Sequence, residues 1–164
     1  MSLMVREGAT TLEFTFEELM KYHGPVAPGG VAHGFTAMQV ALPRLAPLVD
    51  RREVEVRTGF RGPGGRDAVE MVLRAVTEGQ YTVTPQLRRL ERGPLLEDYV
   101  WEFTYRGDRV RVQLRDDGLV TEEFIILARK PSRTTTEEAH LTQLKTEMAD
   151  RLLSRPADQV YEVI

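Results

Sequence analysis

Residues 99–114 read YVWEFTYRGDRVRVQL, two alternating apolar stretches separated by Gly107-Asp108. A two-residue loop that contains glycine suits the primed turns joining antiparallel strands, so the stretch predicts a β-hairpin with Arg106 opposite Arg109. This register brings the large side chains to one face in the pairs Tyr105–Val110, Phe103–Val112 and Trp101–Leu114. Because a slip of one residue would turn one strand's apolar side chains to the other face, we expect the hairpin to cover a core.

Two helices are predicted on the N-terminal side of this hairpin. Thr15 and Glu18 have the spacing of a capping box and Gly24 follows, so residues 16–23 are expected to form a short helix. In a second helix, apolar residues recur at steps of three and four, at Val31, Phe35, Met38, Leu42 and Leu45. Pro43 is expected to kink or end that helix, because proline has no N–H to donate to the preceding turn.

A strand and a third helix are predicted between the second helix and the hairpin. Alternating valines and charged residues predict a half-buried strand over residues 53–57. A tight loop, RGPGGRD, is expected at residues 61–67 and a helix at residues 68–77, ended by Gly79. The apolar face of this helix comprises Val69, Val72, Leu73 and Val76. A short strand is expected near residues 81–84, followed by a loop or one helical turn.

The C-terminal part of the chain predicts a strand and a helix. The stretch TEEFIILARK, residues 121–130, contains a continuous apolar run, which is typical of a buried strand. Thr134 and Glu137 have capping-box spacing and begin a last helix over residues 135–154. The apolar stripe of this helix comprises Leu141, Leu144, Met148 and Leu152.

Composition excludes several classes of protein. The chain has 164 residues, which favours one domain spanning residues 1–164. Its net charge of −3, from 22 basic and 25 acidic residues, gives no indication of nucleic-acid binding. No apolar stretch is long enough to span a membrane, the N-terminus does not resemble a signal peptide, and cysteine is absent. We therefore expect a cytoplasmic protein that binds neither nucleic acid nor membrane.

Residues 21–35, KYHGPVAPGGVAHGF, contain two of the three histidines and raise the question of a metal site. Histidine sites usually need three or four ligands, and here only His23 and His33 are candidates. Zinc or another divalent metal at these two residues is one interpretation. In the other, His23 ends the first helix, where it interacts favourably with the helix dipole, and His33 lies partly exposed in the first turn of the second. His140 is interpreted as a surface residue.

The glycine-rich loop GFRGPGGRD, residues 59–67, is a candidate anion site. Glycines allow backbone N–H groups to approach an anion, and the following helix N-terminus carries partial positive charge. Arg61 and Arg66 could add charged hydrogen bonds beside Gly64. The spacing matches neither a P-loop nor a dinucleotide-binding fingerprint, and Asp67 could serve simply as the N-cap of the helix.

Two stretches together, YHGPVAPGGVAHGF and GPGGRDAVEMVLRAVTEG, resemble the N-terminal domain of the E subunit of formylmethanofuran dehydrogenase and its bacterial relatives. The resemblance covers approximately residues 15–115. The positions that match the family's pattern are Tyr22, His23, Gly24, Pro28, Gly29, Asp67, Ala68 and Gly79. Three others depart from it: Pro25 replaces a second histidine, and Ala27 and Gly64 replace cysteines. Because these are positions from which the family is understood to bind metal, we expect no metal and no cofactor here.

The resemblance implies an α+β fold of helix, strand, helix and three further strands, which agrees with the order predicted from the residues. A small mixed sheet would carry helices on one face, with the C-terminal helix in addition. Its first two strands would be parallel, joined across the helix at residues 68–77 by a right-handed crossover. The positions that match the family's pattern and the glycine-rich loop together predict a site for a small anionic ligand. The candidate residues of this site are His23, Gly29, His33, Arg61, Gly64, Arg66 and Asp67.

Three functions follow from this interpretation. The first is a non-catalytic or small-ligand-binding protein that has lost the family's metal site. The second is a small enzyme or anion- or pterin-binding protein that uses His23, His33 and Asp67, with His23 as general acid or base. The third is a dimeric interaction module built on residues 135–154. A homodimer is expected, formed through the Met148–Leu152 end of the last helix or through the Trp101 face of the hairpin.

Overall fold

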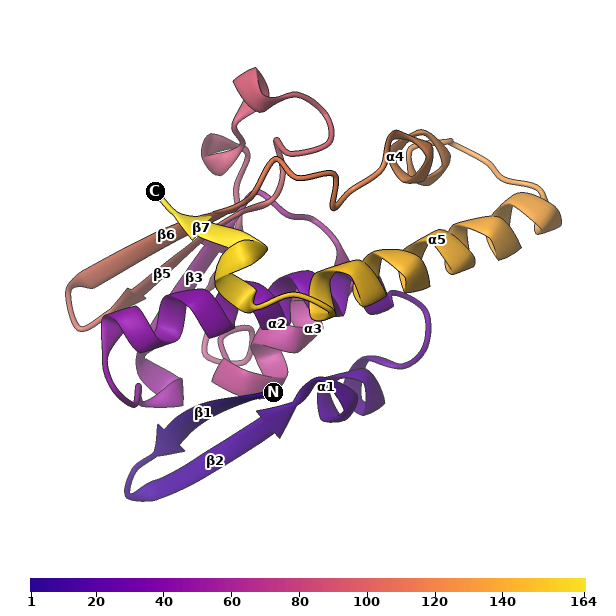
Figure 1. Cartoon of the computed structure of the whole chain (residues 1–164). Coiled ribbons are helices and arrows are strands. Elements are labelled where there is room, and N and C mark those ends of the chain that lie inside the picture. Colours follow the sequence, from indigo (N-terminus) through magenta and orange to yellow (C-terminus); the bar gives the residue numbers. More distant parts are fainter.

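The computed structural model describes residues 1–164 and centres on a five-stranded mixed sheet in the order β4-β3-β5-β6-β7 (Figure 1). Its strands are β3 (Val54–Thr58), β4 (Tyr81–Val83), β5 (Val100–Tyr105), β6 (Asp108–Leu114) and β7 (Tyr161–Val163). As predicted, β3 and β4 are parallel, and all other neighbouring pairs are antiparallel. A separate N-terminal hairpin consists of β1 (Ser2–Glu7) and β2 (Thr10–Thr15).

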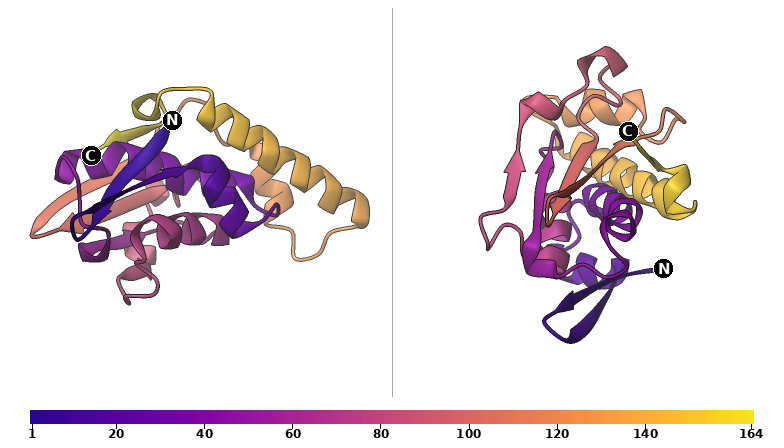
Figure 2. Two further views of the ribbon diagram at one scale, coloured as in Figure 1. Left: turned by 90° about the horizontal axis from the view of Figure 1, so that it is seen from below. Right: turned by 90° about the vertical axis from the view of Figure 1, so that its left-hand side faces the viewer.

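The helices lie on one side of the five-stranded sheet, as the edge-on view in Figure 2 shows. They are α1 (Phe16–His23), α2 (Pro28–Leu45), α3 (Pro63–Leu73), α4 (Glu122–Ala128) and α5 (Thr135–Leu153). The predicted α+β fold, with helices on one face of a mixed sheet and a C-terminal helix, is therefore confirmed. No helix in the chain combines the length and apolar character required to cross a membrane.

Alternation along the strands explains why only one sheet face is covered. The face toward the helices is apolar and includes Val54, Val56, Trp101, Phe103, Val112 and Leu114, all fully buried. On the opposite face, Glu102 receives hydrogen bonds from Arg57 at 3.0 Å and Arg111 at 2.7 Å. This face carries charged side chains paired with one another, so the helices pack on the apolar face alone.

The hairpin forms, but the predicted register is wrong by two residues. Tyr105 pairs with Asp108, Phe103 with Val110 and Trp101 with Val112. The turn is therefore Arg106-Gly107, with φ of 50° and 91°, rather than Gly107-Asp108. A primed turn with positive φ at both central positions favours glycine at the second of them. Since the shift is even, every side chain keeps its predicted face.

The prediction of a strand at residues 121–130 is also wrong, because this stretch forms α4. The Thr121 hydroxyl accepts a hydrogen bond from the Phe124 N–H, and two glutamates follow in the first turn. These are start signals of a helix, and they outweigh the apolar run that suggested a strand. The position beside β6 is taken instead by β7, which was not predicted from the sequence.

Several boundaries differ from those predicted. Helix α1 and its capping box agree with the prediction, whereas α3 begins at Pro63 instead of residue 68 and ends at Leu73, so Val76 lies outside it. Helix α2 continues two residues beyond Pro43 to Leu45. Residues 1–15 carry no predicted element, yet they form the β1–β2 hairpin.

Glycines in the two segments singled out from the sequence, residues 21–35 and 59–67, allow α2 and α3 to pack closely. A Cβ added to Gly64 would lie 2.7 Å from the Ala27 carbonyl oxygen and from the Val31 nitrogen. One turn further along α2, a Cβ on Gly34 would lie 3.1 Å from the Gly65 carbonyl oxygen. Because backbone meets backbone here, the two helices can touch only where side chains are absent. The GPGG motif of the predicted loop thus belongs largely to a helix–helix contact.

Both surfaces proposed for a homodimer are buried within the chain. The α5 stripe packs against α2 and α4, and Met148 and Leu152 are 2% and 0% exposed. Trp101 is fully buried beneath the helices. The α5 stripe is therefore not free to dock a partner. The homodimer itself stays a prediction, but it cannot form through either of these two surfaces.

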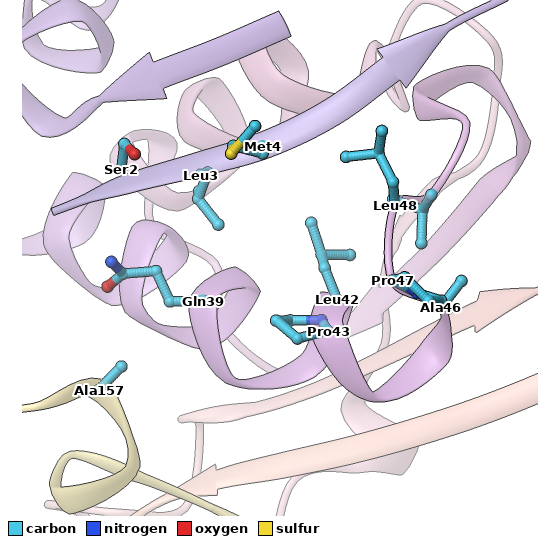
Figure 3. Close-up of a pocket in the computed structure, with 11 residues that line it drawn as sticks. Ser2, Leu3, Met4, Gln39, Leu42, Pro43, Ala46, Pro47, Leu48 and Ala157 are labelled. Carbon is cyan, nitrogen blue, oxygen red and sulfur yellow. The ribbon is translucent and has the colours of Figure 1, made fainter. Parts of the chain in front are cut away.

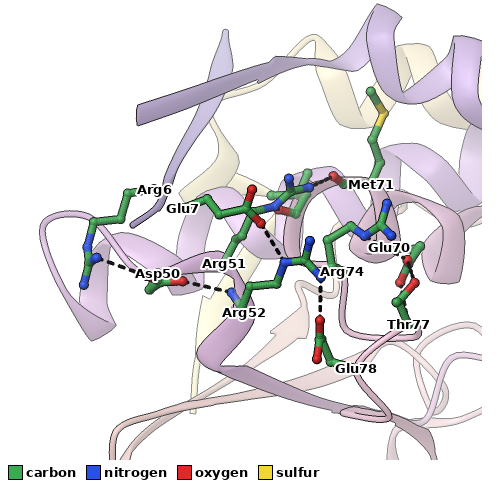
Figure 4. Close-up of polar contacts among 11 residues, drawn as sticks. Arg6, Glu7, Asp50, Arg51, Arg52, Glu70, Met71, Arg74, Thr77 and Glu78 are labelled. Carbon is green, nitrogen blue, oxygen red and sulfur yellow. Dashed lines mark hydrogen bonds and ion pairs between the residues drawn. The ribbon is translucent and has the colours of Figure 1, made fainter. Parts of the chain in front are cut away.

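A buried arginine connects the N-terminal hairpin to the end of α3 (Figure 4). The Arg51 guanidinium donates to the carbonyls of Val72, at 2.9 Å, and Met71, two acceptors at the C-terminus of α3. It also lies over the ring of Phe14 in β2, 5.3 Å from the ring centroid. A cation at a helix C-terminus interacts favourably with the helix dipole, so Arg51 stabilises this junction.

Replacing Arg51 with methionine is expected to lower the free energy of unfolding by about 2 kcal/mol, because two buried carbonyls lose their donor. The matched control is Arg52→Met. Arg52 is more exposed and pairs with Glu7 and Glu78 at the surface, where water and salt screen the charges, so its loss is expected to cost clearly less than that of Arg51. Urea denaturation of the two variants measures the difference, and equal losses would contradict the role given to Arg51.

Candidate functional site

His23 and Asp67 meet at the junction of α1 and α3. The His23 Nδ1 lies 2.7 Å from an Asp67 carboxylate oxygen, and only 6% of the histidine side chain is exposed. The capping box and Gly24 place His23 at the end of α1, while Asp67 lies in the first turns of α3. The other ring nitrogen, Nε2, is buried and has no hydrogen-bond partner.

The two arginines of the predicted anion loop diverge. Arg66 donates to the second carboxylate oxygen of Asp67 at 3.2 Å. Arg61 extends into solvent toward Asp98, at 3.7 Å, and 69% of its side chain is exposed. The N-cap of α3 is Gly62, so the alternative prediction that Asp67 caps this helix is wrong. Asp67 instead links His23 to Arg66. The loop does not gather both guanidinium groups around one anion.

His33 is fully buried, in contrast to the partly exposed position predicted for it. The Trp101 indole donates to the Tyr161 hydroxyl at 3.3 Å, and this hydroxyl lies 2.8 Å from His33 Nδ1. His33 Nε2 in turn lies 3.3 Å from the Met148 sulfur. Tyr161 therefore donates to Nδ1, and Nε2 carries the hydrogen. Burial lowers the pKa of His33 to about 3, so the ring is neutral at physiological pH.

A pocket of about 190 Å³ lies between the two glycine-rich segments and α5. Three rings form its aromatic wall, with centroids of His33 and Tyr99 4.3 Å apart and those of Tyr99 and Phe60 5.3 Å apart. Both neighbouring pairs are stacked, so the three rings pack on one another and form one apolar cluster at this end of the pocket. Val26 and Phe124 add further apolar area.

The remaining wall of this pocket is electropositive. It includes Gly30 in the first turn of α2, Gly64 in the first turn of α3, and Lys145 from α5. Neither helix has a side-chain N-cap or an acidic residue in its first turn, so the partial positive charge of both termini is uncompensated. The Lys145 amine contacts only the Val26 carbonyl, at 3.5 Å, and burial with nearby Arg133 lowers its pKa.

Of the candidate residues, the structure brings His23, Asp67 and Arg66 together, and it separately brings His33 and Gly64 to the pocket. Gly29 instead packs against α5, where an added Cβ would lie 3.2 Å from the Lys145 carbonyl oxygen. Tyr99, Phe60 and Lys145 were missed by sequence reasoning. They come from a loop, a strand end and a distant helix, and no motif in the sequence links them.

The residues present do not fit the metal site that the family resemblance implies. Ala27 and Gly64 lie against one another and line the pocket, but neither carries a donor side chain, and Pro25 is exposed to solvent. No group of three or more histidine, cysteine, aspartate or glutamate side chains is placed to hold a metal ion together. His23 and His33 have separate partners and share no site.

Comparison of the sequence with known proteins does not assign the chain to a family. No protein-family model matches the chain, and no curated protein matches it either. The function is therefore argued from the pocket itself.

Proposed function

We propose that this protein binds a small, flat molecule that carries an anionic group in the pocket between α2, α3 and α5. The observation that carries the proposal is the pairing of a stacked aromatic wall with an electropositive one. A planar ligand would lie along Tyr99 and Phe60, with its anionic group toward Lys145. Two helix N-termini and an ammonium group favour negative charge at that end of the pocket.

Binding is better supported than catalysis. Both nitrogens of His33 are held by Tyr161 and Met148, and the ring itself is stacked on Tyr99, so neither nitrogen is available to a ligand. The His23–Asp67 pair has the geometry of an oriented base, but the free Nε2 atom is buried away from solvent. A general base must reach the proton it removes, and His23 does not line the pocket.

We further propose that the chain is a relative of the E subunit of formylmethanofuran dehydrogenase in which a ligand-binding pocket has replaced the metal site. What supports this is the position of Ala27 and Gly64. The resemblance aligns both with cysteines of the family, and the two residues lie side by side at the pocket. Neither residue offers a metal ligand, and the missing side chain at Gly64 admits the backbone of α2 instead.

A panel of probes tests the proposed ligand class. Benzoate, 4-aminobenzoate and nicotinate supply a planar ring with a carboxylate, benzamide and nicotinamide supply the ring without the charge, and inorganic phosphate supplies the charge without the ring. We expect the carboxylates to raise the melting temperature and to shift Tyr99 and Lys145 signals in NMR spectra. The neutral rings and phosphate are expected to bind at least about tenfold more weakly, since each lacks one of the two contacts.

Matched variants separate this pocket from other sites. Lys145→Met removes the ammonium with little change in length, and a loss of at least about tenfold in carboxylate affinity is expected. Lys21→Met makes the same change at an exposed lysine of α1 and is expected to leave the affinity unchanged. If no carboxylate in the panel binds at 5 mM (roughly the weakest affinity of interest), or if Lys145→Met binds equally well, the proposed function is wrong.

A further inference from the structure

An uncharged groove of about 370 Å³ lies between β1, the C-terminal end of α2 and the segment that follows it (Figure 3). Figure 3 shows Leu3 and Met4 of β1 on one side, with Leu42 and Pro43 of α2 and Leu48 across from them. None of the residues lining the groove carries a charge. This groove is separate from the ligand pocket, with which it shares no lining residue.

One wall of the groove is an open strand edge. The Arg6 N–H points away from β2 and donates to the Val49 carbonyl at 2.9 Å. Because hydrogen-bonding direction alternates along a strand, the backbone groups of Met4 and Ser2 point the same way. They have no backbone partner there, since the chain after α2 pairs with β1 only at Arg6, in a parallel bridge to Asp50. The outer edge of β1 therefore pairs with the segment at Val49 and Asp50 near Arg6, and it is unpaired at Met4 and Ser2.

The other wall contains a backbone carbonyl without its usual helical donor. Pro43 lies inside α2 and has no N–H, so the Gln39 carbonyl one turn earlier lacks its helical donor. Both residues line the groove. The Met4 side chain is 54% exposed and adds apolar surface at the rim of the groove. Backbone donors and acceptors therefore face an apolar floor.

We propose that this groove binds an extended, uncharged segment of another polypeptide, which adds a strand to the edge of β1. Main-chain hydrogen bonds to Met4 would provide affinity, and alternate apolar side chains would pack on Leu42 and Leu48. The absence of charge in the lining excludes an acidic or basic segment, because such side chains would lose water without gaining a partner. Continuity with the existing pairing at Arg6 sets where the added strand begins.

The probe is a blocked seven-residue peptide that alternates threonine and valine and carries an uncharged glutamine at each end for solubility. In NMR titrations we expect the amide signals of Met4, Gln39 and Leu48 to shift, with a dissociation constant between about 10 μM and 1 mM, as for other small interfaces. The same peptide with alternate nitrogens methylated cannot donate along one edge and is expected not to bind.

Matched proline substitutions test the strand edge. Met4→Pro removes the outward N–H of β1, and affinity is expected to fall at least about tenfold. Glu13→Pro makes the same change at the residue paired with Met4, on the other edge of the hairpin, and should leave affinity unchanged. If Met4→Pro fails to fold, Pro43→Ala gives a second test. It restores the N–H donor for the Gln39 carbonyl without harm to α2, and is expected to weaken binding severalfold.

Three results would overturn the proposal. The first is no shift of the groove signals at 2 mM peptide, a concentration above roughly the weakest affinity expected. The second is unchanged affinity in both Met4→Pro and Pro43→Ala. The third is a concentration-dependent shift of the same signals without peptide, accompanied by a doubled mass in light scattering, which would assign the edge to a second copy of this chain.

Discussion

Gly64→Val is expected to lower the free energy of unfolding by about 4 kcal/mol, the largest effect of any single change considered for this protein. A Cβ at this position would already lie 2.7 Å from the Ala27 carbonyl oxygen and the Val31 nitrogen. Both are backbone atoms, which cannot rotate away as a side chain can. The added atoms must therefore separate α2 from α3, and that separation opens the core between them.

Urea denaturation of a graded series measures this effect. Gly64→Ala is expected to cost less than Gly64→Val, because only one carbon must be accommodated. Ala139→Val places a valine at an exposed position of α5 and is expected to cost less than about 1 kcal/mol, the difference in helix propensity. A Gly64→Val protein as stable as the wild type would mean that the close approach of α2 and α3 does not stabilise the fold.

Acid is expected to destabilise the protein through His33, over a pH range set by its two pKa values. Burial lowers the pKa of this histidine from 6.5 to about 3, so below pH 6.5 the unfolded chain binds a proton that the folded chain excludes. The stability contributed by the neutral ring is complete above pH 6.5 and is lost as the pH falls toward 3. The slope approaches about 1.4 kcal/mol per pH unit, for a total of about 5 kcal/mol.

The difference between wild type and His33→Gln isolates this effect from the carboxylates that also titrate in acid. Glutamine keeps a hydrogen-bond acceptor for Tyr161 but does not titrate. Between about pH 6.5 and pH 5, wild-type stability is expected to fall with decreasing pH, whereas His33→Gln, although less stable at neutral pH, changes little. Parallel curves for the two proteins would show that His33 is not neutral and buried in solution.

The part of the fold that was predicted from sequence rests on local signals. The Thr15 capping box with Gly24 was sufficient for both ends of α1, and alternation was sufficient for β3 and for the inward face of the hairpin. The errors arose where two local signals compete. At residues 121–130 an apolar run competes with the Thr121 cap, and at the hairpin two choices of turn keep the same side chains inward.

The candidate site was predicted only in part. His23 and Asp67 were proposed together and are in contact, because both belong to motifs at helix ends. Gly29 and Gly64 are candidate ligand-binding residues by sequence, but Gly29 packs against α5 and Gly64 allows the contact of α2 with α3. Tyr99, Phe60 and Lys145 carry no pattern of their own, since each resembles an ordinary core or surface residue until the chain brings them together.

The sequence by itself determined where most of the helices and strands form and which face of each is apolar, because helix caps and side-chain periodicity act between residues close in the chain. Only the tertiary structure decided that His33 is buried, that β7 rather than residues 121–130 extends the sheet, and that the edge of β1 stays open. The physical reason is that burial and strand pairing depend on contacts between distant segments, and no local pattern specifies which of several apolar segments will occupy a given edge.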